Sequence, residues 1–130
     1  MNFHIITIFP EALESYFDSS ILKRAQKNKF IKIKFYNPRD YAKDKHKVMD
    51  DKPFGGGPGM VFKAEPMIKA IVSAISNSKF LISKQIPKSK FQKIKVIFLT
   101  PSGKQFNQRM ARNFAKKYDN LVLVSGHYEG

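Results

Sequence analysis

Short apolar runs recur along the chain and predict strands. Residues 3–9 are dense in Ile and Phe, as in a short buried strand, whereas residues 31–35 alternate Ile and Phe with lysine in the period of a half-exposed strand. Residues 96–99 and 121–124 are continuous apolar runs, which is the pattern of buried strands. The pattern therefore predicts strands in both halves of the chain.

Apolar residues at helical spacing lie between these runs. Pro10 and Glu11 open a helical stretch through about residue 17, and Ser19 or Ser20 is placed to cap a second helix that ends near residue 28. A third helix is predicted from Glu65 and Pro66 to about residue 77, and a fourth has Phe106, Met110 and Phe114 on one face. The strand-helix-strand rhythm is typical of an α/β domain with a largely parallel sheet and flanking helices.

Two polar segments separate the predicted elements. Residues 37–52 are rich in charge and predict a loop. Residues 79–95 hold six lysines with Pro87, Ser83 and Ser89, and predict a mobile connection with a short strand as an option around residues 80–82. No internal repeat or second domain is visible, so residues 1–130 are expected to form one domain.

The charge balance points to a polyanionic partner. Lys and Arg number 24 against 10 acidic residues, a formal charge of +14, which favours nucleic acid or an anionic surface, although a lysine excess can also reflect genome composition. The absence of cysteine excludes disulfides, thiolate metal sites and thiol nucleophiles. No apolar run reaches membrane-spanning length and no signal peptide is visible, so we expect a cytoplasmic protein with no membrane partner.

Residues 50–60 form the most specific segment, since four of the chain's seven glycines fall between Gly55 and Gly59. It lacks the Gly-Lys-Ser/Thr of a P-loop and the glycine spacing of a dinucleotide fingerprint. Glycines let backbone approach a flat ligand closely, while Pro53 and Pro58 stiffen the path. A ligand-contacting loop and a purely structural turn are both compatible with this composition.

Two further loops follow predicted strands. Residues 99–103 (Leu-Thr-Pro-Ser-Gly) and residues 125–130 (Ser-Gly-His-Tyr-Glu-Gly) carry polar groups and glycines at equivalent strand ends. In open α/β sheets ligands bind beyond such ends, so the loops are interpreted as two walls of one pocket. Gly126 and Gly130 would let backbone reach an adenine or ribose, Tyr128 would stack, and Glu129 would accept hydrogen bonds. Ordinary packing is the alternative for His127 and Tyr128.

Acidic and histidine residues near the glycine-rich loop suggest substrate contact more than metal binding. His46 lies four residues before Asp50, but zinc sites need three or four convergent ligands and no others cluster here. No metal site is predicted. Of the pair Asp50 and Asp51, only Asp50 is favoured for substrate contact.

Taken together, these segments closely resemble the bacterial tRNA (guanine-N1)-methyltransferases, the TrmD family of the SPOUT superfamily. The resemblance runs through the whole chain in order. The segments that carry it are residues 5–11 (Ile-Ile-Thr-Ile-Phe-Pro-Glu), Arg24, Pro38-Arg39-Asp40, residues 50–60, Thr100-Pro101-Ser102-Gly103 and residues 125–130.

The resemblance implies an α/β fold with a deep trefoil knot, S-adenosyl-L-methionine bound between loops, and a homodimer that completes each site. The implied reaction methylates N1 of the guanosine just after the tRNA anticodon. The implied cofactor-binding residues are Leu99, Thr100, Pro101, Ser125, Gly126, Tyr128, Glu129 and Gly130. The implied substrate-binding residues are Arg24, His46, Asp50 and Gly59.

The chain departs from the family in length. Family members continue for about as long again, through a third cofactor loop that closes the knot, a linker with the catalytic Asp and Arg, and a carboxy-terminal tRNA-binding domain. The resemblance therefore implies that no catalytic residue lies in this chain and that the chain alone is inactive. Guanine N1 carries a proton at neutral pH, so methyl transfer needs a base.

Two other classes stay open on the residues alone. A non-catalytic basic RNA-binding module would use the surface charge and a degenerate pocket. A nucleotide-binding enzyme with phosphate contacts in the glycine-rich loop is disfavoured by the glycine spacing.

Overall fold

A computed structural model of the chain describes residues 1–80 and 93–127. The elements in chain order are β1 (Asn2–Ile6), α1 (Pro10–Phe17), α2 (Ser20–Lys27), β2 (Lys32–Tyr36), the 3-10 helix η1 (Pro38–Tyr41), β3 (Asp50–Asp51), β4 (Val61–Phe62), α3 (Ala64–Phe80), β5 (Ile94–Leu99), α4 (Gln108–Lys117) and β6 (Asn120–Ser125).

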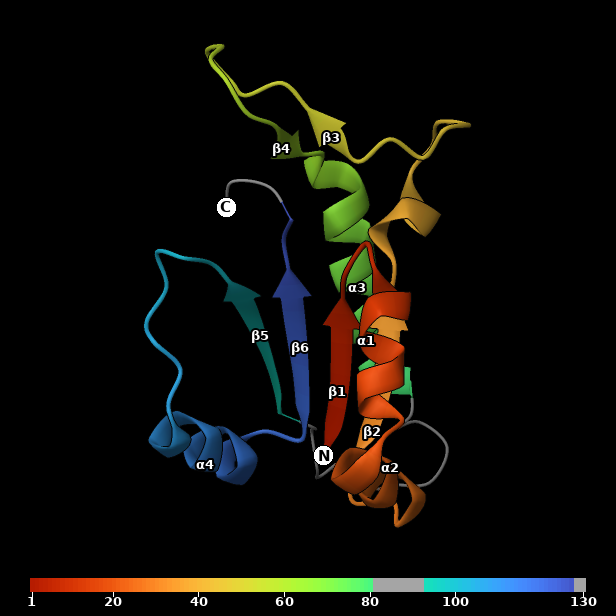
Figure 1. The fold of residues 1–130 in the computed structure, drawn as a ribbon, viewed down its shortest axis with the longest axis vertical. Coiled ribbons are helices and arrows are strands. Elements are labelled where there is room, and N and C mark those ends of the chain that lie inside the picture. The colour runs from red at the N-terminus through yellow and green to blue at the C-terminus, as the bar shows by residue number, and fades with distance from the viewer. Residues whose placement is uncertain (81–92, 128–130) are drawn as a thin grey trace.

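Four strands form one parallel sheet in the order β2-β1-β6-β5, and β3 and β4 form a separate antiparallel hairpin. The hairpin lies beyond the carboxyl ends of the parallel strands, while α2 and α4 lie near their amino ends (Figure 1). The expectation of an α/β domain with a parallel sheet is confirmed.

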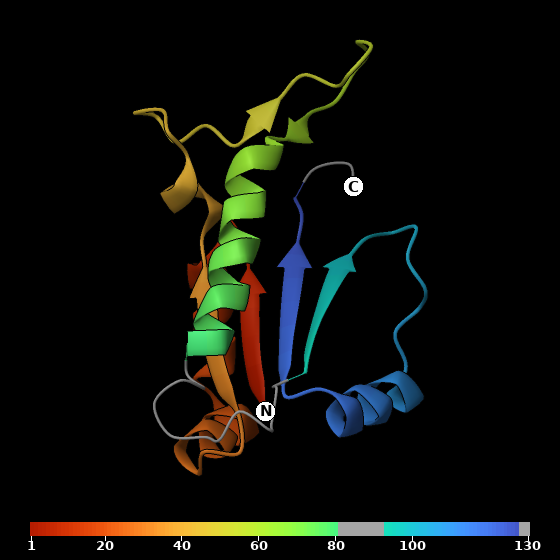
Figure 2. The ribbon, with the colours of Figure 1, turned by 180° about the vertical axis from the view of Figure 1, so that it is seen from behind.

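The two faces of the sheet are covered by different helices. Figures 1 and 2 show α1 on one face of β1 and β2 and α3 on the other. Phe17 of α1 packs against Phe35 of β2, with ring centroids 5.9 Å apart. The core on the α3 face consists of Ile6, Tyr36, Met67, Ala70, Ala74, Val122 and Val124. Small residues on α3 let this helix approach the strands closely, which fits the complete burial of Ala70 and Ala74.

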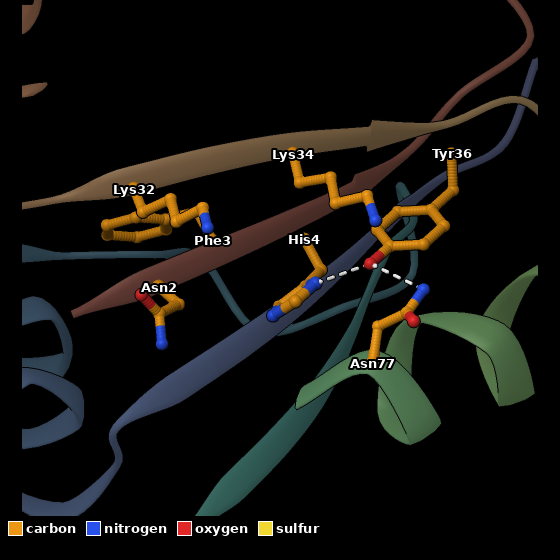
Figure 3. Close-up of a pocket in the computed structure, with 7 residues that line it drawn as sticks. All are labelled: Asn2, Phe3, His4, Lys32, Lys34, Tyr36 and Asn77. Carbon is orange, nitrogen blue, oxygen red and sulfur yellow. Dashed lines mark hydrogen bonds between the residues drawn. The ribbon is translucent and has the colours of Figure 1, made fainter. Parts of the chain in front are cut away.

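Polar residues occupy the other end of the same interface. His4 is buried and its Nδ1 lies 3.0 Å from the Tyr36 hydroxyl, while its Nε2 lies 2.9 Å from Ser78 Oγ. Asn77 of α3 donates from Nδ2 to the Tyr36 hydroxyl at 3.4 Å (Figure 3). Beside this network lies a cavity of about 110 Å³, also lined by Lys32 and Lys34. The α3 face is thus apolar toward the carboxyl ends of the strands and polar toward their amino ends.

Several element boundaries differ from the sequence prediction. The first strand was expected to reach Phe9 but ends at Ile6, because Thr7 Oγ1 accepts a hydrogen bond from Phe9 N and turns the chain into α1. The third helix extends to Phe80, past the expected end near Asn77. Helix α4 begins at Gln108, since Asn107 caps it, and leaves Phe106 before its first turn.

The polar segments also hold more structure than expected. Residues 37–52 contain η1 and β3, so the prediction of a plain loop was wrong at both places. The predicted connection at residues 79–95 is helical at its start and enters β5 at Ile94. Residues 81–92, with most of that connection and most of the optional strand at residues 80–82, lie outside the described residues.

Candidate functional site

The carboxyl ends of β5 and β6 lie side by side. Leu99, the last residue of β5, is the register partner of Ser125, the last residue of β6, in a parallel pair. The loops that follow therefore leave from neighbouring points at one edge of the sheet, where backbone groups are no longer used by the ladder. Leu99 is 57% exposed there, which leaves an apolar side chain open to solvent beside the two loops.

The loop after β5 is an ordered turn. Gly103 N donates to Thr100 O at 3.0 Å, and Pro101 occupies the second position, where its fixed φ favours a β-turn. Thr100 Oγ1 lies 2.9 Å from Ser102 Oγ and accepts from Ser102 N at 3.3 Å. A Cβ built on Gly103 would lie 3.1 Å from Thr100 O, so a side chain at this position would crowd the turn. The turn thus presents hydroxyl groups on a restrained backbone.

The loop after β6 contacts elements from the first half of the chain. His127 packs edge-on against Phe9, with ring centroids 5.2 Å apart and an interplanar angle of 79°. A Cβ built on Gly126 would lie 3.7 Å from Phe62 Cε2, which is ordinary contact and places β4 beside this loop. Phe9 and Phe62 thus form an aromatic wall next to the end of β6.

Arg39 adds a positive charge to this wall. Its guanidinium carbon lies 5.7 Å from the centroid of the Phe9 ring, a cation–π contact. Its backbone is fixed because Arg39 N donates to Asn37 Oδ1 at 3.0 Å and Pro38 is buried. Arg39 Nε is buried and has no hydrogen-bond partner among the described residues. Because a buried donor without a partner costs free energy, this group is a candidate for contact with an acceptor outside the described residues.

The glycine-rich loop joins the two strands of the hairpin. Asp50 pairs with Phe62 and Asp51 with Val61, and the base is held by the bond from Lys63 N to Met49 O at 2.8 Å. Met49 is 2% exposed and anchors the hairpin to the domain. The tip carries positive φ angles at Gly55, Gly56, Gly57 and Gly59, which side chains rarely adopt. The glycines are therefore required by the backbone path itself.

Exposed charged residues in residues 40–48 and at the start of α3 form ion pairs and hydrogen bonds. Glu65 at the start of α3 accepts from Lys43 and Lys69, each at 2.8 Å, and these bonds lower its pKa to about 2. Lys47 lies 3.4 Å from Asp40. The Asp44 carboxylate accepts from Val48 N at 2.8 Å, which lowers the pKa of Asp44. These groups are exposed, so each pair contributes little to stability.

Comparison with known proteins assigns the chain to a family. The family model described as tRNA (Guanine-1)-methyltransferase TrmD matches residues 1–130. The chain belongs to this family. It is similar to the tRNA (guanine-N(1)-)-methyltransferases of Ruminiclostridium cellulolyticum, at 43% identity, and of Dictyoglomus turgidum, at 44% identity, over the whole chain in both cases.

A solved structure of the TrmD family has the same fold. The crystal structure of tRNA (m1G37) methyltransferase from Aquifex aeolicus superposes with a TM-score of 0.76 at 28% identity and covers the whole chain. The chain spans 52% of that structure, and 50% and 46% of the two relatives above. It therefore spans about half the length of the TrmD family members that it matches.

The structure brings together most of the described residues that the sequence singled out. Leu99, Thr100, Pro101, Ser125 and Gly126 lie at one edge of the sheet. Asp50 and Gly59 belong to the hairpin beyond the same edge, and His46 is exposed in the segment before it. Tyr128, Glu129 and Gly130 lie outside the described residues.

Arg24 is the exception. It is exposed on α2, near the amino ends of the strands and at the opposite end of the sheet from the hairpin (Figure 1). Arg24 and Gly59 are therefore not brought together within the described part of the chain. A partner that contacts both Arg24 and the hairpin would contact them with different parts of its surface.

Sequence reasoning missed the wall formed by Phe9, Arg39 and Phe62. A sequence signal for Phe9 and Arg39 was present, since they follow β1 and β2. These strands lie parallel to β5 and β6, so the loops after all four strands begin at the same edge of the sheet. For Phe62 no such signal existed, since the short strand β4 has no distinctive local pattern.

Within residues 1–80 and 93–127 no group of three or more His, Asp or Glu is arranged to hold a metal ion. No helix in the described ranges is both long and apolar enough to cross a membrane.

Proposed function

We propose that this chain forms the donor-binding part of an S-adenosyl-L-methionine-dependent methyltransferase that modifies guanine N1 in tRNA, next to the anticodon. The observation that carries the proposal is the register of Leu99 with Ser125, because it makes the two loops expected to hold the donor begin side by side. Membership of the TrmD family over residues 1–130 supports the reaction and the tRNA partner.

The residues at this edge fit a methyl donor with a flat base. Exposed Leu99 offers apolar surface, and Gly126 has no side chain to obstruct a ring. Backbone and hydroxyl groups of Thr100, Pro101 and Ser125 offer hydrogen bonds to the donor, and we assign Tyr128, Glu129 and Gly130 to the same role. Bound S-adenosyl-L-methionine supplies an activated methyl group on a sulfonium.

On the substrate side we assign Asp50, Gly59 and His46, which flank the same edge of the sheet, and Arg24 as a more distant RNA contact. No residue of this chain is assigned as the base that removes the N1 proton. The chain alone is accordingly expected to be inactive in methyl transfer, and clear turnover on tRNA by the 130 residues would contradict this assignment. The whole protein is proposed to be a cytoplasmic homodimer with a trefoil knot.

Donor binding is tested by calorimetric titration of S-adenosyl-L-methionine into this chain and two variants. Leu99→Asp removes apolar contact at the proposed site, so we expect roughly ten- to hundredfold weaker binding. Phe98→Asp is the matched control, since Phe98 is similarly exposed, at 61% against 57%, but its side chain points to the other face of the same strand. Equal losses in both variants would show that the effect is not local to the site.

Binding of RNA without any donor binding is the result that contradicts the proposal. It would favour a basic RNA-binding module, for which the formal charge of +14 is the supporting observation.

A further inference from the structure

Phe54 is the most exposed large apolar side chain among the described residues, at 102% of its reference area. It lies in the loop between β3 and β4, which projects away from the sheet beyond the carboxyl ends of the strands (Figure 1). A single exposed aromatic is ordinary on a protein surface, so the geometry around it decides whether it has a role.

The ring is presented on a hydrogen-bonded corner. Gly56 N donates to Pro53 O at 3.1 Å, which closes a four-residue turn with Phe54 in the second position. Gly55 in the third position has φ of 85°, as a type II turn requires. Pro53 limits the backbone before the ring. The turn therefore restrains the backbone of Phe54 while leaving the side chain in water.

The space around this turn is open. A Cβ built on Gly55, Gly56 or Gly57 would meet no heavy atom within 4 Å. The rest of the tip, residues 52–59, contains only lysine, proline and glycine. Aromatic anchors of protein interfaces are normally ringed by other side chains that exclude water, and this loop supplies no such ring.

The positive charge of the chain and of Lys52 indicates which class of partner fits Phe54. The chain carries a formal charge of +14, which attracts a polyanion. Lys52, two residues before Phe54, is exposed and has no ion pair within the described ranges. A flat apolar ring beside a free lysine matches the combination that binds single-stranded nucleic acid, in which bases stack on the ring and phosphates meet the charge.

We propose that Phe54 is a stacking platform for an unpaired nucleobase of the bound RNA. The proposal rests on the proposed function and adds a contact to it: a base that is splayed out of the RNA packs on the Phe54 ring at the tip of the hairpin, away from the loops that hold the donor. The open glycine backbone leaves room for the base and its sugar.

The chain contains no tryptophan, so Phe54→Trp creates a single fluorescent reporter at the proposed contact. The probe is a synthetic anticodon stem-loop RNA, titrated while RNA binding is followed separately by anisotropy of a labelled RNA. We expect the emission of Phe54→Trp to be quenched at least about twofold at saturation, because a stacked base quenches indole. Phe54→Ala is expected to bind the same RNA about five- to hundredfold more weakly, and Phe54→Tyr to bind normally.

Phe30→Trp is the matched control, since Phe30 is also an exposed aromatic, at 71%, in the turn between α2 and β2. Its emission is expected to stay unchanged. RNA binding with an unquenched reporter at position 54 would overturn the stacking proposal and leave the proposed function standing. Absence of RNA binding by this chain would also overturn the stacking proposal, whereas the titration with S-adenosyl-L-methionine decides the proposed function separately. Emission that changes with protein concentration in the absence of RNA would assign the ring to a protein contact instead.

Discussion

The hydrogen bonds around His4 favour one protonation state. Ser78 Oγ donates its only proton to Ala74 O at 2.7 Å, so it must accept from His4 Nε2. Nδ1 is then the acceptor for the Tyr36 hydroxyl. His4 is thus neutral with its proton on Nε2, and a second proton on Nδ1 would face the Tyr36 donor.

This arrangement predicts a loss of stability in acid. Burial lowers the pKa of His4 below 6.5, and the nearby charges of Lys34 and Lys32 act in the same direction against the hydrogen bond to Asn120. Because the unfolded chain then binds the proton more readily, the stabilisation is complete above pH 6.5 and is lost as the pH falls below it. Urea unfolding at pH 7.5 and at about pH 5 should give a lower midpoint in acid.

Two matched variants separate His4 from an exposed histidine, His46. In His4→Gln the urea midpoint should depend less on pH than in the unchanged chain, even if the variant is less stable at both pH values. In His46→Gln the dependence of the midpoint on pH should be kept, because His46 is exposed. An unchanged slope in His4→Gln would show that another group is responsible.

Tyr36→Phe tests the same network from the other side. The substitution keeps the ring but removes the hydroxyl that donates to His4 Nδ1 and accepts from Asn77. Leaving a buried acceptor without its donor costs about 1–3 kcal/mol in the free energy of unfolding. Tyr16 is 66% exposed, so Tyr16→Phe should change the free energy of unfolding by less than about 0.5 kcal/mol. Thermal or urea unfolding of both variants measures the difference.

Among the elements, α4 depends most clearly on its cap. Asn107 Oδ1 accepts from Met110 N at 3.0 Å and satisfies one of the free amides of the first turn. Asn107→Ala should destabilise the domain by about 0.5–2 kcal/mol, whereas Asn107→Asp should be nearly neutral because it keeps the acceptor. Equal losses in the two variants would mean that the cap is not the cause.

Elements with a strong local pattern could be predicted from the sequence. The alternation at residues 31–35 marked β2 correctly, because alternate side chains of this strand are half-buried. The apolar run at residues 96–99 marked the position of β5, but the prediction of a buried strand was wrong, since no residue of β5 is buried and Phe98 and Leu99 are 61% and 57% exposed. The end of α3 could not be predicted in this way. Asn77 is a weak helix former, but its side chain bonds to Tyr36, and the helix continues past it.

Part of the candidate site could also be predicted from the sequence, and part could not. The loops after β5 and β6 were recognised from strand ends and glycines, and the register confirms that they are neighbours. The wall of Phe9, Arg39 and Phe62 was missed because it is assembled by contacts between distant segments. The positions of β3 and β4 depend on the buried Met49 and on one backbone bond from Lys63, and neither leaves a periodic signal.

At the scale of the whole molecule, charge governs the expected interaction with RNA. A chain with a formal charge of +14 releases counterions when it binds a polyanion, so its affinity for tRNA should fall with salt. Between 50 and 200 mM KCl we expect at least about a tenfold loss, measured by anisotropy or filter binding. An affinity that does not change with salt would show that the lysines are solvated and make no contact.

The strand order has a consequence for how the chain folds. β6 lies between β1 and β5, yet it follows both in the sequence, and Asn2 pairs with Asn120. Until β6 arrives, β1 has a neighbour on one side only, and more than a hundred residues must be looped out before the second is gained. Such late, non-local closure is slow. On the ribosome, β1 and α3 must wait for β6, which contributes Val122 and Val124, before the core that they share is shielded from water.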